Sequence, residues 1–257
     1  TAPNVHDFMW AADPEYKHVT RKVKNDLTIH LLYKSSDPAT AGWEKILDNA
    51  EKALPFIEKT FGPYPYRQYS FIQGGDGGME YAMSTLLSGP GAWLHEWMHS
   101  WYHGVLATNE SLYAWMDEGF TTYAGGRVQA FLNSDTTNFS QAGSYKSYYS
   151  LVKSDKEEPL TTHADHFNTN AAYSAASYSK GAVFLEQLGY ITGAATRDKI
   201  LHEYYRLWKF KHPNSSDFIR VAEKVSDMKL DWYKEYWVNS IKTIDYAFDS
   251  LWEEGGK

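Results

Sequence analysis

The stretch GAWLHEWMHSWYHG, residues 91–104, contains the pattern H-E-x-x-H. Its histidines are His95 and His99, and Glu96 follows the first of them. Apolar residues recur around them at helical spacing, so we predict a helix over 91–106. Residues four apart share one helix face at about 6 Å, which lets both imidazoles hold one metal ion. Glu96 can reach water on that ion without binding the ion, which is the position of a general base.

A catalytic zinc ion needs a third protein ligand and an open position for water. Glu118, in WMDEGFTTY, follows His99 by nineteen residues. We predict a second helix over 110–131, from which Glu118 faces back to the first helix across an antiparallel pair. Asp117 is a candidate to orient a ligand histidine. The H-E-x-x-H pattern alone also arises by chance, so this third ligand carries much of the metal hypothesis.

Other histidines give weaker indications. His163 and His166 in THADHF have i, i+3 spacing in an apparent loop, and a second metal there is the weaker hypothesis. His103 follows the metal helix and is more typical of a solvated or supporting residue than of a ligand. The tryptophans of this region are expected to pack in the core: Trp93, Trp97, Trp101 and Trp115.

Composition excludes several classes of protein. The 257 residues contain no cysteine, so disulfides are excluded and any metal must be held by His, Asp or Glu. The formal net charge is −7 with no basic block, so we expect no nucleic-acid partner. No apolar run reaches about 18 residues, so we expect no membrane span. The opening TAPNVHDFMW lacks the features of a signal peptide, and both an exported and a cytoplasmic location stay open.

The order of the predicted elements indicates an α+β fold. The opening residues read as extended segments broken at Asp13-Pro14. Four glycines lie in GGDGGME, which follows the predicted strand 69–73. Strands are predicted over 27–34 and 69–73, with an amphipathic helix over 42–61 between them. Besides the two helices already named, we predict helices over 140–153, 177–191, 196–210, 215–226 and 230–240. Strands first and helices afterwards favour α+β.

Four motifs in order carry a family resemblance: GGMEY, HEWMHSW, the Asp-Glu-Gly-Phe that contains Glu118, and YSKGAVFLEQL. With them the chain resembles the gluzincin aminopeptidases of the aminopeptidase N and leukotriene hydrolase type. The resemblance implies a thermolysin-like catalytic domain over 27–257, a small mixed sheet followed by a mostly helical part. It makes residues 1–26 the remnant or junction of an N-terminal β domain. Similar bacterial sequences are often exported.

The resemblance also implies roles at the metal. One Zn²⁺ per chain would be held by His95, His99 and Glu118, with Glu96 as general base and proton shuttle. Tyr178 matches the tyrosine that stabilises the oxyanion, and a neutral phenol is a suitable donor to developing negative charge.

Substrate binding is implied for the segment before the metal helix. Glu80 matches the glutamate that holds the free α-amino group of a peptide. The glycine-rich backbone beside it can lie along the substrate. The full set of expected substrate-binding residues is Glu80, Gly77, Gly78, Met79 and Tyr173.

Three hypotheses for function remain. Family members normally carry a large N-terminal β domain, and many a helical C-terminal one, and neither is present in full. Only fourteen residues separate Glu80 from His95, fewer than usual. A zinc aminopeptidase acting on peptides with a free N-terminus is the first hypothesis. The others are a zinc endopeptidase with an opened cleft, and a zinc-binding but catalytically incomplete domain that needs N-terminal and C-terminal domains.

Overall fold

The computed structural model describes residues 1–24, 26–75, 77–135, 141–243 and 248–252. Its strands form one five-stranded sheet in the order β1-β2-β3-β5-β4. The β2/β3 and β3/β5 pairs are parallel, whereas β1/β2 and β4/β5 are antiparallel, so the sheet is mixed and β4 forms one edge. The strands are β1 Tyr16–Lys24, β2 Leu27–Lys34, β3 Gln68–Gln73, β4 Gly78–Tyr81 and β5 Ser84–Leu87.

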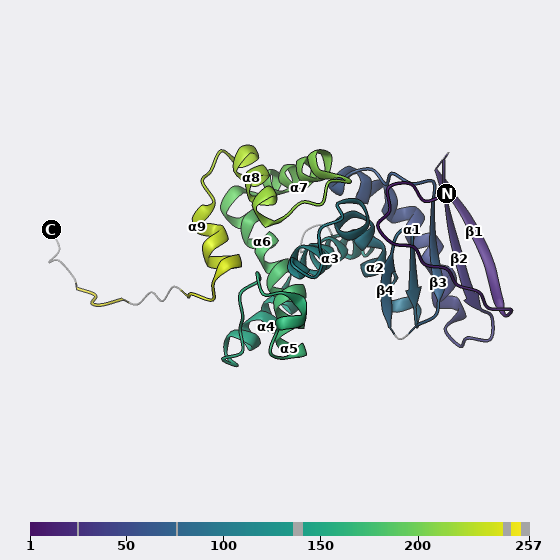
Figure 1. Cartoon of the computed structure of the whole chain (residues 1–257), viewed down its shortest axis with the longest axis horizontal. Coiled ribbons are helices and arrows are strands. Elements are labelled where there is room, and N and C mark those ends of the chain that lie inside the picture. Colours follow the sequence, from purple (N-terminus) through teal and green to yellow (C-terminus); the bar gives the residue numbers. More distant parts are fainter. Residues whose placement is uncertain (25, 76, 136–140, 244–247, 253–257) are drawn as a thin grey trace.

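The predicted strand over 27–34 and the predicted long helix are both confirmed. Every second residue of β2 is buried, as expected for a strand with one face against the core. Helix α1, Thr40–Phe61, buries its apolar stripe and packs against β2. The aromatic rings of Tyr33 and Trp43 lie 6.3 Å apart across this contact. Sheet and helix lie at one end of the molecule (Figure 1), and their buried residues belong to a core that continues into the helical part.

Helices predominate among the described residues after β5, so the predicted α+β class is confirmed. They are η1 Pro90–Ala92, α2 Trp93–His99, η2 Ser100–Val105, η3 Trp115–Gly119, α3 Phe120–Leu132, α4 Ala142–Val152, η4 Ala164–His166, α5 Asn170–Ser174, η5 Ala175–Lys180, α6 Gly181–Thr192, α7 Ala194–Trp208, α8 Ser215–Ser226, α9 Asp231–Lys234 and η6 Glu235–Asn239. Segments η2, η3, η5 and η6 are π-helical, and η1 and η4 are 3₁₀. Residue 140 of the predicted helix 140–153 lies outside the described residues.

Two predicted helix starts are wrong. The helix expected from 110 begins at Trp115, because residues 110–112 form a turn in which the Asn109 side chain accepts the Leu112 amide at 3.1 Å. The helix expected from 177 begins seven residues earlier, at Asn170, where the Thr169 hydroxyl caps the amide of Ala172.

Two strands, β4 and β5, were not predicted, and only the first residues of β1 fall in the segments that were expected to be extended. β1 is a charged edge strand with mostly exposed or half-buried side chains, and β4 and β5 have four residues each, so none shows a clear alternation. β1 pairs with β2 in the same sheet. The division of the chain into 1–26 and 27–257 stays a prediction, and residues 253–257 lie outside the described ones.

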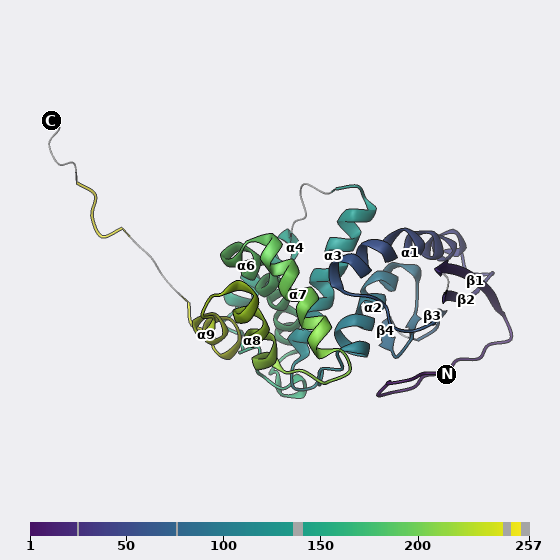
Figure 2. The ribbon, with the colours of Figure 1, turned by 90° about the horizontal axis from the view of Figure 1, so that it is seen from above.

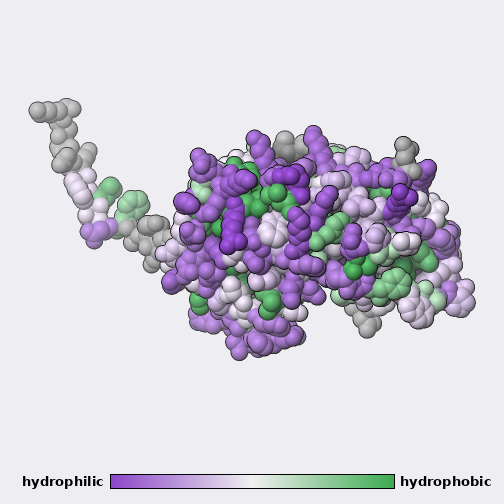
Figure 3. Space-filling model, turned by 45° about the horizontal axis from the view of Figure 1, so that its top comes forward, coloured by the Kyte–Doolittle hydropathy of each residue, from purple (hydrophilic) through white to green (hydrophobic). Residues whose placement is uncertain are grey.

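Helix α2 lies between the sheet and the helical part, beside β4 (Figures 1 and 2). The four tryptophans expected in the core are all buried. The face in Figure 3 is mainly hydrophilic with small separate hydrophobic areas. Within the described residues, every helix falls short of the length or the apolar character that crossing a bilayer demands.

Candidate metal centre

Three predicted ligands converge on one point. The Nε2 atoms of His95 and His99, both on α2, lie 3.2 Å apart. Glu118 Oε2, on η3, lies 3.1 Å from the first and 3.3 Å from the second. A tetrahedral zinc ion with bonds of about 2.0–2.1 Å needs ligand atoms about 3.3–3.4 Å apart. The triangle therefore has the size that zinc requires, and its two imidazole nitrogens and one carboxylate oxygen are donors that suit a zinc ion.

Asp117 contacts one of these predicted ligands. Its Oδ1 lies 2.6 Å from His99 Nδ1, and both side chains are buried. A proton on Nδ1 that is donated to Asp117 leaves the Nε2 lone pair directed at the metal position. Burial disfavours the charged imidazole, but Asp117 and Glu118 hold the pKa of His99 well above its usual value. The surroundings of His99 thus favour positive charge.

Glu96 lies beside the triangle in a space left by Gly78. A Cβ atom at Gly78 would lie 2.2 Å from Glu96 Oε1, so only glycine leaves room for this carboxylate. The Glu96 side chain is buried, and burial raises its pKa to about 7. β4 and α2 thus bring Gly78 and Glu96 together.

Tyr178 approaches the triangle from η5. Its hydroxyl donates to Glu118 Oε1 at 2.7 Å, and its ring stacks on His95 at a centroid distance of 5.7 Å. Burial, and then the charge of Glu118, raise the pKa of Tyr178, so the phenol keeps its proton. The approach depends on two glycines: a Cβ on Gly119 would lie 2.6 Å from the Cα of Gly181.

Glu80 places another carboxylate beside the predicted metal ligands. It is buried on edge strand β4, and its carboxylate lies within 4.8 Å of those of Asp117 and Glu118. Burial raises the pKa of Glu80, and the nearby charges of Asp117 and Glu118 add to the rise. A cation close to Glu80 would relieve this repulsion.

These groups line one hollow of about 280 Å³. The predicted site residues reach its wall, except for Gly77, which precedes β4 with a φ of +131°. Sequence reasoning missed Ser111 and Ala164, which meet there because the Ala164 amide donates to the Ser111 carbonyl at 2.8 Å. The lining residues are Gly78, Met79, Glu80, His95, Glu96, His99, Glu110, Ser111, Asp117, Glu118, Ala164, Tyr173 and Tyr178.

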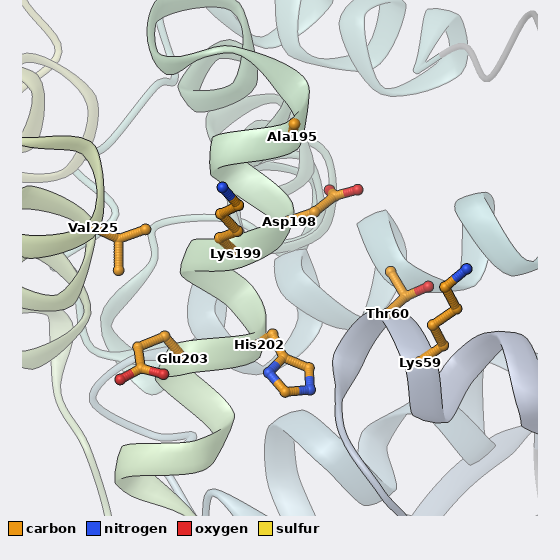
Figure 4. Close-up of a pocket in the computed structure, with 8 residues that line it drawn as sticks. All are labelled: Lys59, Thr60, Ala195, Asp198, Lys199, His202, Glu203 and Val225. Carbon is orange, nitrogen blue, oxygen red and sulfur yellow. The ribbon is translucent and has the colours of Figure 1, made fainter.

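A larger hollow of about 660 Å³ lies elsewhere, between the end of α1 and α7 (Figure 4). Its wall mixes Lys59 and Lys199 with Asp198 and Glu203. Among the described residues, the sets of three ligand atoms within 4.8 Å of one another all lie in the smaller hollow. His163 accepts the Asp165 amide at 3.1 Å and so caps η4. We therefore assign the chemistry to the smaller hollow.

Comparison with known proteins agrees with this geometry. A Peptidase family M1 domain matches residues 92–237. Leucine aminopeptidase 2 of Sclerotinia sclerotiorum is 30% identical over 69% of this chain and 32% of its own length. A leukotriene A-4 hydrolase homolog of Botryotinia fuckeliana is 30% identical over 69% of this chain and 30% of its own length. The chain spans about a third of the length of these relatives.

Solved structures share the fold. The M1 zinc metallopeptidase of Deinococcus radiodurans superposes with a TM-score of 0.71 at 20% identity, over 90% of this chain and 52% of that one. A mutant of it bound to a Tyr-Ser-Ala substrate gives the same score over 87% and 51%. The family and these structures imply zinc as the cofactor, which the His-His-Glu triangle fits.

Proposed function

The chain belongs to peptidase family M1, and from this premise we propose that it acts as a zinc-dependent aminopeptidase that removes N-terminal residues from peptides. One observation carries the proposal. The zinc-sized triangle of His95, His99 and Glu118 shares its hollow with a further buried carboxylate, Glu80, whose chemistry suits an ammonium group.

Zinc held by this triangle would polarise the scissile carbonyl and acidify a water molecule. Glu96 accepts the proton of the attacking water and delivers it to the amine nitrogen as the C–N bond breaks. Its position beside His95 on α2 supports this role, since the carboxylate reaches the hollow without belonging to the triangle.

Tyr178 donates a hydrogen bond to the negative charge that develops on the carbonyl oxygen. Its phenol keeps its proton and lies against Glu118, so a small rotation turns the hydroxyl from that carboxylate toward the substrate. Removing one donor to a developing oxyanion costs about 2.7–4 kcal/mol in the hydrolase subtilisin. Tyr173, whose ring meets that of Tyr178 edge-on at 6.4 Å, lines the same wall.

The charges of the hollow favour substrates with a free N-terminus. Five carboxylates line the hollow. In the proposed mechanism Glu118 binds zinc and Glu96 accepts the proton of the water. Asp117 contacts His99, and Glu110 lies near His103. Glu80 remains, and burial makes an ammonium partner favourable for it. The outer edge of β4, at Gly78 and Met79, is open to pair with the backbone of a peptide.

Hydrolysis of fluorogenic aminoacyl amides, with and without N-acetylation, tests the proposal in parallel with zinc analysis. We expect turnover of free amines only, loss of activity with a chelator, and a loss of about 10²–10⁴-fold in kcat for Glu96→Gln with zinc retained. Near-normal turnover by Glu96→Gln would remove Glu96 from the mechanism.

The same assay separates the two alternatives. Cleavage of N-blocked peptides would favour a zinc endopeptidase with an opened cleft, because anchoring by Glu80 forbids such substrates. One zinc per chain without turnover of any peptide would favour a zinc-binding domain that needs further domains for catalysis. Retained discrimination against N-acetylated substrates in Glu80→Gln would exclude Glu80 as the amine anchor.

A further inference from the structure

A second histidine pair repeats the geometry of the metal pair. His6 Nε2 and His103 Nε2 lie 3.2 Å apart, with ring centroids at 4.7 Å and planes at 85°. The corresponding values for His95 and His99 are 3.2 Å, 4.8 Å and 84°. Two imidazole nitrogens so placed lie close to one tetrahedral edge of about 3.3 Å.

A carboxylate also lies near this pair, although farther from it than Glu118 lies from the first pair. Glu110 Oε2 lies 3.8 Å from His103 Nε2. The Glu110 side chain is 52% exposed, so rotation about its own bonds can bring the oxygen into the coordination sphere. Two imidazoles and one carboxylate form a donor set that suits zinc and neighbouring divalent transition metals.

The pair is held in place on both sides. His103 is buried on η2, one turn beyond His99, with 6.2 Å between their ring centroids. His6 lies in the segment before β1, which is fixed by two contacts. The Tyr66 hydroxyl donates to the Asn4 carbonyl at 3.3 Å, and the Ala82 amide donates to Asp7 Oδ1 at 3.1 Å.

We propose that His6, His103 and Glu110 form a second site for a divalent transition metal of the zinc class, distinct from the site of His95, His99 and Glu118. Since His6 is far from His103 in sequence, a metal bound here joins the N-terminal segment to the helix that carries the catalytic ligands. It also occupies Glu110, which lines the catalytic hollow.

Zinc titration of the whole chain tests the proposal. Metal content is measured by mass spectrometry at saturating buffered zinc, and affinity by calorimetry. We expect two equivalents in the wild type, one in His6→Gln, and a second affinity at least about tenfold weaker in Glu110→Gln. Excess zinc should also raise the Tm of the wild type above that of the one-zinc form, and His6→Gln should lack this further rise.

Two controls make the result specific. His18→Gln removes a histidine that lies 3.0 Å from His30 between β1 and β2, and it should keep both equivalents. His95→Gln should weaken the other equivalent and keep this one, so failure of the catalytic site and failure of the second site are distinguishable. A wild type that binds only the equivalent lost in His95→Gln overturns the proposal, as does a second equivalent unchanged in His6→Gln.

Discussion

At Gly78, the absence of a side chain leaves room for the carboxylate of the catalytic candidate Glu96. A Cβ atom there would meet Glu96 Oε1 at 2.2 Å and Ala92 Cβ at 3.0 Å. The carboxylate ends a flexible side chain, so Gly78→Ala should fold and bind zinc but displace Glu96. We expect kcat/KM to fall about a hundredfold, the cost of a misplacement near 1 Å.

Gly91→Ala is the matched control, because a Cβ at Gly91 meets nothing within 4 Å. The prediction is tested by measuring kcat/KM on aminoacyl amides and the zinc content of both variants. Equal kcat/KM for Gly78→Ala and the wild type would mean that the position of Glu96 does not limit the reaction.

Single residues divide into those that sequence predicts and those it does not. His95, His99 and Asp117 follow from helical spacing and neighbouring acidic residues, and the structure brings them together. The need for glycine at position 78 could not be predicted, because it arises where β4 meets α2, eighteen residues later in the chain. The contact between His103 and His6 could not be predicted either, because the two residues lie 97 positions apart in the sequence.

At the scale of elements, the π-helical segments are what periodicity missed. The predicted helix 91–106 is confirmed in position, yet it changes from α to π directly after His99. Glu118 and Tyr178 also lie in π-helical turns. A π turn adds one residue to the local repeat, which a 3.6-residue apolar pattern does not reveal, and such turns often occur at functional sites.

The contact of η3 with the start of α6 depends on paired glycines. A Cβ on Gly181 would lie 2.8 Å from Gly119 Cα and 2.9 Å from the Trp115 carbonyl, both of them backbone atoms. Gly181→Ala must therefore separate the two helices, and we expect a loss of about 1–3 kcal/mol in the free energy of unfolding. Urea unfolding measures it.

Gly125→Ala in α3 is the control, since a Cβ there meets nothing within 4 Å. Alanine in a helix interior should stabilise the protein by about 0.5–1 kcal/mol. If both substitutions changed the stability alike, close packing at Gly181 would not be the cause.

The β1/β2 pair carries a pH-dependent contact. His30 Nδ1 lies 3.0 Å from His18 Nε2, and burial, then the charge of His18, lower the pKa of His30. As the pH falls below about 6.5, the unfolded chain takes up this proton more readily than the folded one. The contribution of neutral His30 is therefore complete above about 6.5 and is lost on acidification through the lower pKa of the folded state.

Urea unfolding at about pH 7.5 and pH 5.5 should thus show a smaller loss of stability in His30→Gln than in the wild type. His18→Gln should reduce the loss by a smaller amount, because it removes only the charge of the neighbour. An unchanged difference between the two pH values in His30→Gln would exclude this contact as a source of pH dependence.

On the scale of the whole molecule, the site is assembled from distant parts. Glu80 comes from the sheet, the histidines from α2, Glu118 from η3 and Tyr178 from η5. The order of the motifs predicted which residues meet, because they match those of a known family. Ser111 and Ala164 also line the hollow. Their position depends on how the loops fold back toward the hollow, and the local sequence pattern does not indicate the path of these loops.

This assembly predicts a large effect of zinc on global stability. The triangle links α2 to η3, and without a metal ion the positive charge favoured at His99 offsets only part of the repulsion among the Glu80, Asp117 and Glu118 carboxylates, whose oxygens lie within 4.8 Å of one another. A ligand that binds only the folded state stabilises it by about 4 kcal/mol at a thousand times its Kd. Chelation should therefore lower the Tm of the entire transition, and a Glu118→Gln protein, with a weaker triangle and one charge fewer, should lose less. If zinc-loaded and chelated proteins melted at the same temperature, the ion would not hold the two segments together, and the triangle would be rigid through packing alone.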